Sequence, residues 1–413
     1  MRQQNIEIAC RRLREDVAAF AESEVRPRIA GMEASRAVDP AMARLIAQQG
    51  WIGITVPTKF GGMGLGHLAK TVIIEGLARV SGASGAIVQA SQLGVAGILH
   101  FGSEKQKRRW LPAVATGACL PTIAVTEPGS GGHVLGMETR AVRYGDEYVL
   151  TGRKVFVGNS HVGDVHKVVV RTGPGSRGLS AFLVEADRPG VSLGAWRPAL
   201  GLHGFSFGEI VLDDCRVPVE NRLGDEGQGL DVAYSSSVLY GRLNLAAVAL
   251  GIHRAVVEDT VAFATGRQRY GQALSSLPTV MDKLGRMQSR LMTARLAVED
   301  AAQRLDRGLP CDGELMNAKL VSVELALDSA RAAMEIHAAS GLMGDLPVER
   351  YLRDLQHLYA PAGTSDVQVL RLAQVALGTA PGPQWSERFA APAASAWGGE
   401  AAAAYRGKSA ARS

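Results

Sequence analysis

The spacing of apolar residues changes twice along this chain, and these changes constrain its fold more than any single motif. Between residues 6 and 118, apolar side chains recur at helical spacing, and Asp39 and Ser103 are typical helix N-caps. From about 120 to 222 the segments are short, alternating or β-branched, and separated by Gly, Asp and Pro turns. Helical spacing returns from 230 to 378. This order indicates three successive units: a helical unit, a unit of strands without intervening helices, and a second helical unit.

We therefore predict an α+β protein of three domains. Residues 1–120 form an N-terminal helical domain, 121–222 a small middle β-barrel domain and 223–378 a C-terminal antiparallel helical bundle. A length of 413 residues fits this division, because a single hydrophobic core seldom grows that large. Residues 379–413 are rich in Ala, Gly and Pro, and we expect a low-complexity tail that is mobile or docks elsewhere.

Composition argues against several kinds of partner. The 45 Lys and Arg residues exceed the 40 Asp and Glu residues by only 5, and aromatic residues make up 5% of the chain, so we expect neither nucleic acid nor a membrane. The four cysteines lack C-x-x-C spacing, which predicts reduced thiols, and we expect no metal site. We recognise no signal peptide and no apolar run long enough to span a bilayer, and expect a cytoplasmic protein.

The stretch from Glu335 to Gln368 combines helices with two tight turns. Small residues around Gly341 let two backbones or a flat ligand approach closely, and a Pro-Ala-Gly hinge opens the last helix at Thr364. The N–H groups and partial positive charge of that helix start suit an anion. A bundle corner with a good N-cap would give the same pattern, so this stretch alone leaves both interpretations open.

Six further segments are recognisable by their order and spacing. They are V-P-T-K-F-G-G-M-G-L-G from Val56, G-S-E-K-Q-K-R-R-W-L-P from Gly102, A-V-T-E-P-G-S-G from Ala124, V-P-V-E-N-R-L-G-D-E-G-Q-G from Val217, R-Q-R-Y-G from Arg267 and L-P-V-E-R-Y-L-R-D from Leu346. In this order they resemble the acyl-CoA dehydrogenase family over roughly residues 10 to 378. Each segment is weak alone, but six in family order make the resemblance specific.

The resemblance implies a flavoprotein oxidoreductase. Family members bind FAD between the β-domain and the bundle, usually with a second subunit of a homodimer or homotetramer completing the site. They remove a proton next to the carbonyl of an acyl thioester, carried on CoA or a carrier protein, and pass hydride from the neighbouring carbon to flavin N5. The residues that match FAD contacts are Val125 and Thr126 beside the flavin, Arg267 and Tyr270 reaching a partner's cofactor, Gly341 at a turn, and Thr364 and Ser365 near the phosphates.

Two departures from the family pattern affect the catalytic base. Most members carry a glutamate where this chain has Ala362, and a subset carries it where this chain has Gly241, just before an arginine that matches Arg242. A positioned carboxylate contributes about 10²- to 10⁴-fold to proton transfer. Its absence from both positions predicts that ordinary α,β-dehydrogenation is impaired, and the catalytic residue stays unknown.

The expected flavin contacts are also altered. Phe156 can still stack on the isoalloxazine, but Gly158 replaces a threonine, and Gly132 and His133 replace a serine and an aspartate. His133 could carry a proton, although a surface loop histidine would look the same. The partner subunit's FAD-contacting glutamines are changed to Glu335 and to Pro278 or Thr279.

Three functions remain open on these grounds. The first is a flavin-dependent dehydrogenase or oxidase of an acyl thioester, as in secondary-metabolite pathways, with an unusual base. The second is a flavin-dependent monooxygenase, in which reduced flavin activates O₂ and no α-proton base is needed. The third is a non-redox acyl-thioester enzyme or binding protein on the same scaffold.

Overall fold

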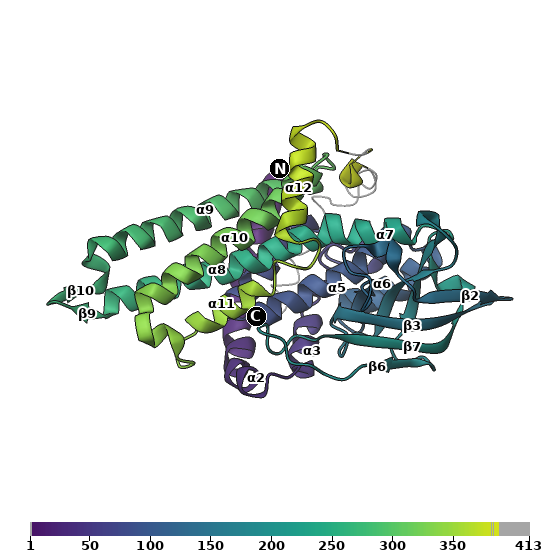
Figure 1. Ribbon diagram of the computed structural model, residues 1–413, viewed down its shortest axis with the longest axis horizontal. Coiled ribbons are helices and arrows are strands. Elements are labelled where there is room, and N and C mark those ends of the chain that lie inside the picture. Colours follow the sequence, from purple (N-terminus) through teal and green to yellow (C-terminus); the bar gives the residue numbers. More distant parts are fainter. Residues whose placement is uncertain (1, 381, 383, 388–413) are drawn as a thin grey trace.

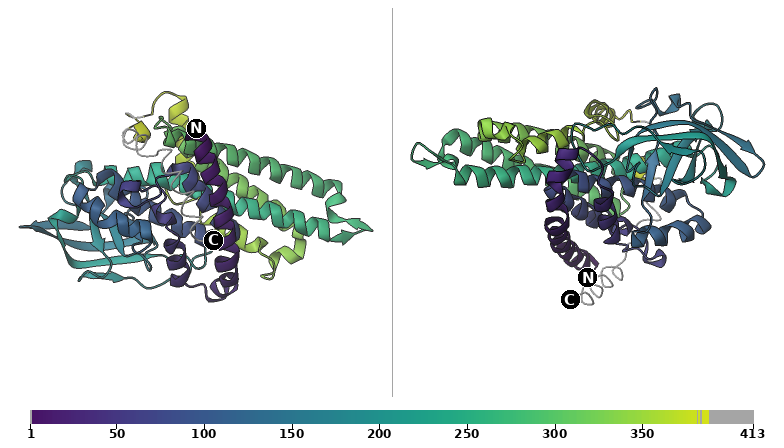
Figure 2. Two further views of the ribbon diagram at one scale, coloured as in Figure 1. Left: turned by 180° about the vertical axis from the view of Figure 1, so that it is seen from behind. Right: turned by 90° about the horizontal axis from the view of Figure 1, so that it is seen from below.

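The computed structural model describes residues 2–380, 382 and 384–387. Figure 1 shows the helical bundle at one end of the molecule and the β-domain at the other. Seen from behind, the N-terminal helices lie across the junction of the two (Figure 2). The predicted α+β architecture, with helical, β and helical domains in chain order, is confirmed.

Local capping sets the starts of two N-terminal helices. The helices of this domain are α1 (Arg2–Phe20), α2 (Ile29–Ser35), α3 (Pro40–Gln48), α4 (Gly66–Val80), α5 (Gly82–Phe101) and α6 (Glu104–Thr116). The Asp39 carboxylate accepts the N–H of Met42 at 3.0 Å at the start of α3. Ser103 and Gln106 form a capping box at the start of α6. Both starts therefore agree with the sequence.

The apolar helix α5 is the core of the N-terminal domain. Its length and composition would allow it to cross a bilayer, so the expectation of no apolar run of that length is wrong. However, 89% of its apolar window is buried inside the protein. Small and aliphatic residues all round the helix are typical of a helix enclosed by other helices.

The middle domain is a single mixed sheet in the described chain. Its strands are β1 (Pro121–Ala124), β2 (Arg140–Tyr144), β3 (Glu147–Gly158), β4 (Val165–Arg171), β5 (Leu179–Glu185), β6 (Val191–Leu193), β7 (Phe207–Pro218) and β8 (Arg222–Leu223). They follow the order β6-β7-β3-β2-β4-β5-β8, and β1 pairs with β4 in parallel. A bulge between Lys154 and Val157 interrupts the pairing of β3 with β7.

The bundle follows the sheet. It comprises α7 (Gly229–Ser235), a π-helical turn η8 (Ser236–Gly241), α8 (Arg242–Gly266), α9 (Pro278–Asp306), α10 (Asp312–His337), α11 (Val348–Gln356) and α12 (Ser365–Ala376). The π-turn therefore interrupts the helical segment that follows residue 230, and it ends at Gly241. A small hairpin, β9 (Gln268–Arg269) with β10 (Gln272–Ala273), forms the tip of the bundle farthest from the sheet (Figure 1).

The described part of the C-terminal segment docks on the bundle. The Trp385 ring stacks on Tyr234 of α7 with centroids 5.2 Å apart. The Asp312 carboxylate at the start of α10 accepts the N–H groups of Trp385 and Ser386 at 2.8 and 2.9 Å. The rest of the predicted low-complexity tail lies outside the described residues.

Candidate functional site

The two positions expected to carry a catalytic base converge in the structure. Gly241 ends the π-turn before α8, and Ala362 lies in the loop between α11 and α12. A Cβ atom added to Gly241 would lie 3.3 Å from Cβ of Ala362 and 3.4 Å from Cδ2 of Leu93. Because neither residue has a polar side chain, this wall offers no acid or base.

A buried lysine holds the loop that carries Ala362. Nζ of Lys319, from α10, donates to the carbonyl oxygens of Tyr359 at 2.9 Å and Pro361 at 2.5 Å, and to that of Gly363. Burial, with a contribution from nearby Arg242, lowers the pKa of Lys319 to about 7. The sequence analysis missed this residue, and its one local signal is a lysine within the otherwise apolar stretch L-M-N-A-K-L-V-S-V.

The loop backbone is held in an unusual conformation. Ala362 and Gly363 have φ angles of 57° and 97°, in the left-handed region. Nε2 of Gln368 donates to both of their carbonyl oxygens, at 3.0 and 3.2 Å. Donors from α10 and α12 thus fix the loop from two sides, and its strain is concentrated where residue 362 faces the π-turn before α8.

An aromatic ladder connects the sheet to this loop. Phe156 is 63% exposed, and the β3 bulge gives it a φ of 56°. Its ring stacks on Phe207 with centroids 5.5 Å apart, and Phe207 contacts the His357 ring edge-on at 4.8 Å. His357 lies just after α11, on the segment leading to Ala362. A bulge that re-aims a side chain in this way is typical of functional sites.

The residues before Phe156 are fixed by a buried ion pair. Nζ of Lys154 lies 2.7 Å from Oε1 of Glu127 and donates to the carbonyl oxygen of Val125 at 2.9 Å. Burial lowers the pKa of Lys154 to about 8, although the Glu127 carboxylate favours its ammonium form. The N–H of Val155 donates to the carbonyl oxygen of Thr126 at 2.8 Å. Val125 and Thr126 are therefore held beside the ladder, as the sequence predicts for residues that share a site.

Three other predicted positions have specific surroundings. Gly158 lies against α5, where an added Cβ would meet Cβ of Ala90 at 2.9 Å and Cζ of Phe205 at 3.1 Å, so a larger residue would need the neighbours to move. Gly341 is similarly close to Cβ of His337. His133 is exposed, and no hydrogen bond joins its ring to the described residues. Its proposed proton-transfer role therefore gains no support from local contacts.

The start of α12 matches only part of the anion site predicted at Thr364 and Ser365. Thr364 is the N-cap, and its hydroxyl accepts the N–H of Val367 at 3.4 Å. The Ser365 hydroxyl donates to the Glu324 carboxylate at 2.5 Å and is therefore already engaged. The backbone N–H groups of the first turn remain the groups suited to an anion.

Arg267 and Tyr270 are not brought together with the other predicted residues. Both are exposed, Tyr270 to 90%, and they lie at the β9–β10 hairpin, at the opposite end of the molecule from the sheet (Figure 1). One chain therefore cannot place them beside its own Phe156. Their predicted role requires a second subunit.

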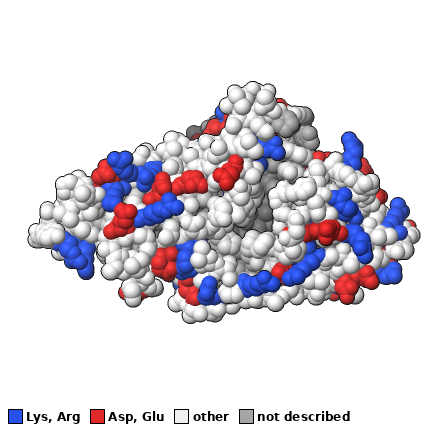
Figure 3. Space-filling model, viewed as in Figure 1, with Lys and Arg blue, Asp and Glu red and all other residues white. Residues whose placement is uncertain are grey.

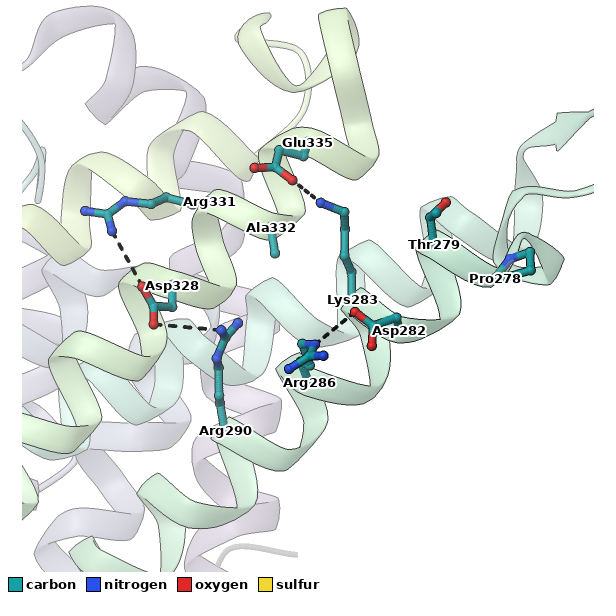
Figure 4. Close-up of a pocket in the computed structure, with 10 residues that line it drawn as sticks. All are labelled: Pro278, Thr279, Asp282, Lys283, Arg286, Arg290, Asp328, Arg331, Ala332 and Glu335. Atoms are coloured by element: carbon teal, nitrogen blue, oxygen red, sulfur yellow. Dashed lines mark hydrogen bonds and ion pairs between the residues drawn. The ribbon is translucent and has the colours of Figure 1, made fainter.

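A charged groove between α9 and α10 contains the remaining predicted positions. Its volume is about 640 Å³ (Figure 4). Its lining residues are Pro278, Thr279, Asp282, Lys283, Arg286, Arg290, Asp328, Arg331, Ala332 and Glu335. Lys283 pairs with Glu335, and both Arg290 and Arg331 pair with Asp328. Four cations against three carboxylates leave a slight positive excess on this face.

Figure 3 shows that the molecule is hollowed between the bundle and the β-domain. Within the described residues, no group of three or more His, Cys, Asp or Glu side chains could hold a metal ion. All four cysteines are free and buried, in agreement with the predicted reduced thiols.

Comparison with known proteins identifies this arrangement. Residues 9–118, 122–215 and 227–377 match the N-terminal, middle and C-terminal domains of acyl-CoA dehydrogenase. An acyl-CoA dehydrogenase of Bacillus subtilis is 34% identical over 369 residues, which cover 89% of this chain and 97% of that protein.

Two solved structures share the fold. The prolyl acyl carrier protein oxidase AnaB superposes with a TM-score of 0.84 at 27% identity, covering 89% of this chain and 98% of AnaB. PigA with FAD and proline superposes with a TM-score of 0.83 at 26% identity, covering 90% of this chain and 97% of PigA. Since all three domains match in order and nearly the whole length of these relatives is covered, the chain belongs to the acyl-CoA dehydrogenase family.

Proposed function

We propose that this protein is an FAD-dependent oxidoreductase that acts on an acyl thioester carried on CoA or on a carrier protein. The observation that carries the proposal is the contact between Phe207 of the sheet and His357 of the loop. Phe207 also stacks on the exposed ring of Phe156, and His357 lies on the segment that leads to Ala362, whose Cβ faces the Cβ position of Gly241. A flat aromatic surface and an apolar wall suit a flavin beside an acyl chain.

FAD is the cofactor of this family, and the described residues fit its flavin end. Phe156 offers an open ring face, and Val125 and Thr126 present backbone groups near it. Bound FAD supplies the hydride acceptor. The other end of the cofactor would need Arg267 and Tyr270 from a partner, so the expected homodimer or homotetramer is part of this proposal.

At the two positions where the family carries its catalytic base, the residues of this chain shape the site and transfer no proton. Lys319 and Gln368 hold the loop, and Ala362 closes it against Gly241. Tyr240, next to Gly241, does not replace the missing base, because burial raises its pKa far above neutral pH. Burial lowers the pKa of His357, which disfavours its protonated form, so His357 is a weak candidate for the missing base.

The missing base favours a second candidate, a flavin-dependent monooxygenase, because activation of O₂ by reduced flavin needs no α-proton base. AnaB is an oxidase of a prolyl group on a carrier protein, which supports carrier-protein delivery and secondary metabolism as part of the proposal. A cytoplasmic location belongs to the same proposal. The third possibility, a non-redox thioester protein, requires that FAD be absent.

An anaerobic titration of the purified protein tests these functions. We expect a visible flavin band that is bleached by an acyl-CoA or by an acyl group on a carrier protein. Bleaching only by an added reductant, followed by O₂ uptake, would favour the monooxygenase. A protein that takes up no FAD on reconstitution would refute both flavin functions.

A further inference from the structure

The described end of the chain forms a short turn that closes on the start of α10. Residues 384–387, which we name the C-terminal strap, lie beyond residue 377, where the match to the C-terminal domain of acyl-CoA dehydrogenase ends. Within the strap, the N–H of Gln384 donates to Oε2 of Glu387 at 3.0 Å. The strap is therefore a folded feature that this chain adds to the three matched domains.

Four hydrogen bonds join the strap to Cys311 and Asp312, and they run in both directions. The Asp312 carboxylate accepts the N–H groups of Trp385 and Ser386 at 2.8 and 2.9 Å. In return, Oγ of Ser386 accepts the N–H of Cys311 at 2.9 Å. Oε1 of Gln384 accepts the N–H of Asp312 at 3.0 Å. Side chains of the strap thus serve N–H groups at a helix start, where the Cys311 side chain forms no capping hydrogen bond within the described chain.

The strap also packs against α7. The Trp385 ring stacks on Tyr234 with the ring planes 12° apart. Ser386 is 3% exposed, and Cys311 beneath it is fully buried. A stacked aromatic pair combined with reciprocal hydrogen bonds specifies one docked position. The strap therefore binds α7 and α10 at the same time.

Each of these two helices supports one half of the wall described above. Tyr234 lies just before the π-turn η8, which ends at Gly241. Asp312 begins α10, and Lys319, about two turns further along that helix, holds the loop that carries Ala362. Cβ of Ala362 lies 3.3 Å from the Cβ position of Gly241. The strap therefore connects the supports of the two facing residues.

The π-turn makes the α7 side of the wall adjustable. A π-turn interrupts the regular hydrogen bonds of a helix, and such turns are frequent at functional sites. The helix before it, α7, is only seven residues long. A short helix on such a turn is held in place mainly by contacts with its neighbours. The stack of Trp385 on Tyr234 is one of these contacts.

We propose that the C-terminal strap controls the wall formed by Gly241 and Ala362. When docked, the strap holds α7 and α10 together. When released, it frees the π-turn and the loop at the same time. The inference goes beyond the proposed function, because it concerns how the chain regulates the shape of its own site.

Cys311 offers a direct probe of strap release. Its thiol is fully buried where Ser386 docks, and a buried thiol reacts only when it becomes accessible. We expect Trp385→Ala to raise the rate of Cys311 alkylation by iodoacetamide about 5- to 100-fold in the full-length protein, through loss of the aromatic anchor. Three other buried cysteines serve as internal standards and should keep their wild-type rates: Cys10, Cys119 and Cys215.

Hydrogen–deuterium exchange in the same samples tests the coupling to the wall. We expect Trp385→Ala to raise amide exchange over residues 234–241 and over residues 358–366, because release of the strap frees both segments. Exchange in β4 and β5 should stay at the wild-type level. This difference separates release of the strap from a general loss of stability.

Two matched variants grade the effect. Trp385→Phe keeps an aromatic ring on Tyr234 and should retain most of the protection. Ser386→Ala removes only the acceptor of the Cys311 N–H, so alkylation and exchange should rise less than in Trp385→Ala. Should Trp385→Ala not fold, Ser386→Ala gives the same comparison between the wall and the sheet.

Three results would overturn the inference. If alkylation of Cys311 rises while exchange over residues 234–241 and 358–366 stays unchanged, the strap docks without controlling the wall. Unchanged alkylation would show that the strap does not cover Cys311. An equal rise of exchange in β4 and β5 would make Trp385 a general stabiliser. Because these measurements need no thioester, failure of the protein to bind FAD or a thioester would count against the proposed function alone.

Discussion

Replacing Lys319 with methionine tests how the loop around Ala362 is held. In the wild-type protein, the ammonium group donates to the carbonyl oxygens of Tyr359, Pro361 and Gly363. Methionine has a similar length but no donor. The carbonyl of Gly363 keeps a donor, because Nε2 of Gln368 lies 3.2 Å away. The other two carbonyls lose the donor that the structure shows for them.

The cost can be worked out from these contacts. An unsatisfied buried polar group costs about 1–3 kcal/mol, so two carbonyls cost at most roughly 2–6 kcal/mol, and the upper end does not apply because Tyr359 is partly exposed. Relief from burying the ammonium group offsets part of this cost. We expect the free energy of opening the loop to fall by about 2–4 kcal/mol, which corresponds to a rise in amide exchange of roughly 30- to 1,000-fold.

Hydrogen–deuterium exchange of peptides covering residues 358–366 measures this change directly. Lys70→Met is a matched control, because Lys70 is also fully buried but has its one described hydrogen bond to a side chain, Nδ1 of His67 at 2.7 Å. That variant should leave exchange in the loop unchanged. If Lys319→Met also leaves loop exchange at the wild-type level, the ammonium group does not hold the loop and the reasoning fails.

Four variants test other parts of the structure. Ala362→Glu should raise dehydrogenation of an acyl-CoA by up to about 10²- to 10⁴-fold. Gly241→Glu should raise it less, because the new Cβ atom would lie only 3.3 and 3.4 Å from neighbouring carbon atoms. Flavin bleaching under anaerobic conditions measures both rates, and no gain with FAD bound would contradict an intact thioester site. Burial holds the pKa of Lys70 well below 10.5, so the unfolded chain binds more protons than the folded chain between neutral pH and pH 10.5. The free energy of unfolding should therefore rise with pH over this range. Lys70→Met should flatten this rise in urea titrations by at most about 1.4 kcal/mol per pH unit, and an unchanged slope would refute the assignment. Trp385→Ala should lower the free energy of unfolding by about 1–3 kcal/mol through loss of stacking on the bundle, and an unchanged thermal melt would show that the docked segment contributes no stability.

Local interactions explain why much of the fold could be predicted. The carboxylate of Asp39 and the capping box at Ser103 act within one helical turn, and both helices begin where these residues indicate. The segments from 120 to 222 look short in the sequence, whereas β3 extends from Glu147 to Gly158 because it pairs with β7. The π-turn that ends at Gly241 also has no signal in the helical spacing. Element type followed from short-range spacing, whereas element length depended on pairing and packing.

The sequence by itself determined the family, the order of the domains and the loss of both expected base residues, because these are properties of residue identity and order. Only the tertiary structure decided that Gly241 and Ala362 face each other, since residues so far apart in the chain meet only through helix packing. It also decided which cations have partners. Lys319 and Arg242 are both basic residues in helical segments, but the loop carbonyls reach only Lys319. Hydrogen bonds require atoms at close range, and the arrangement of the helices sets that range.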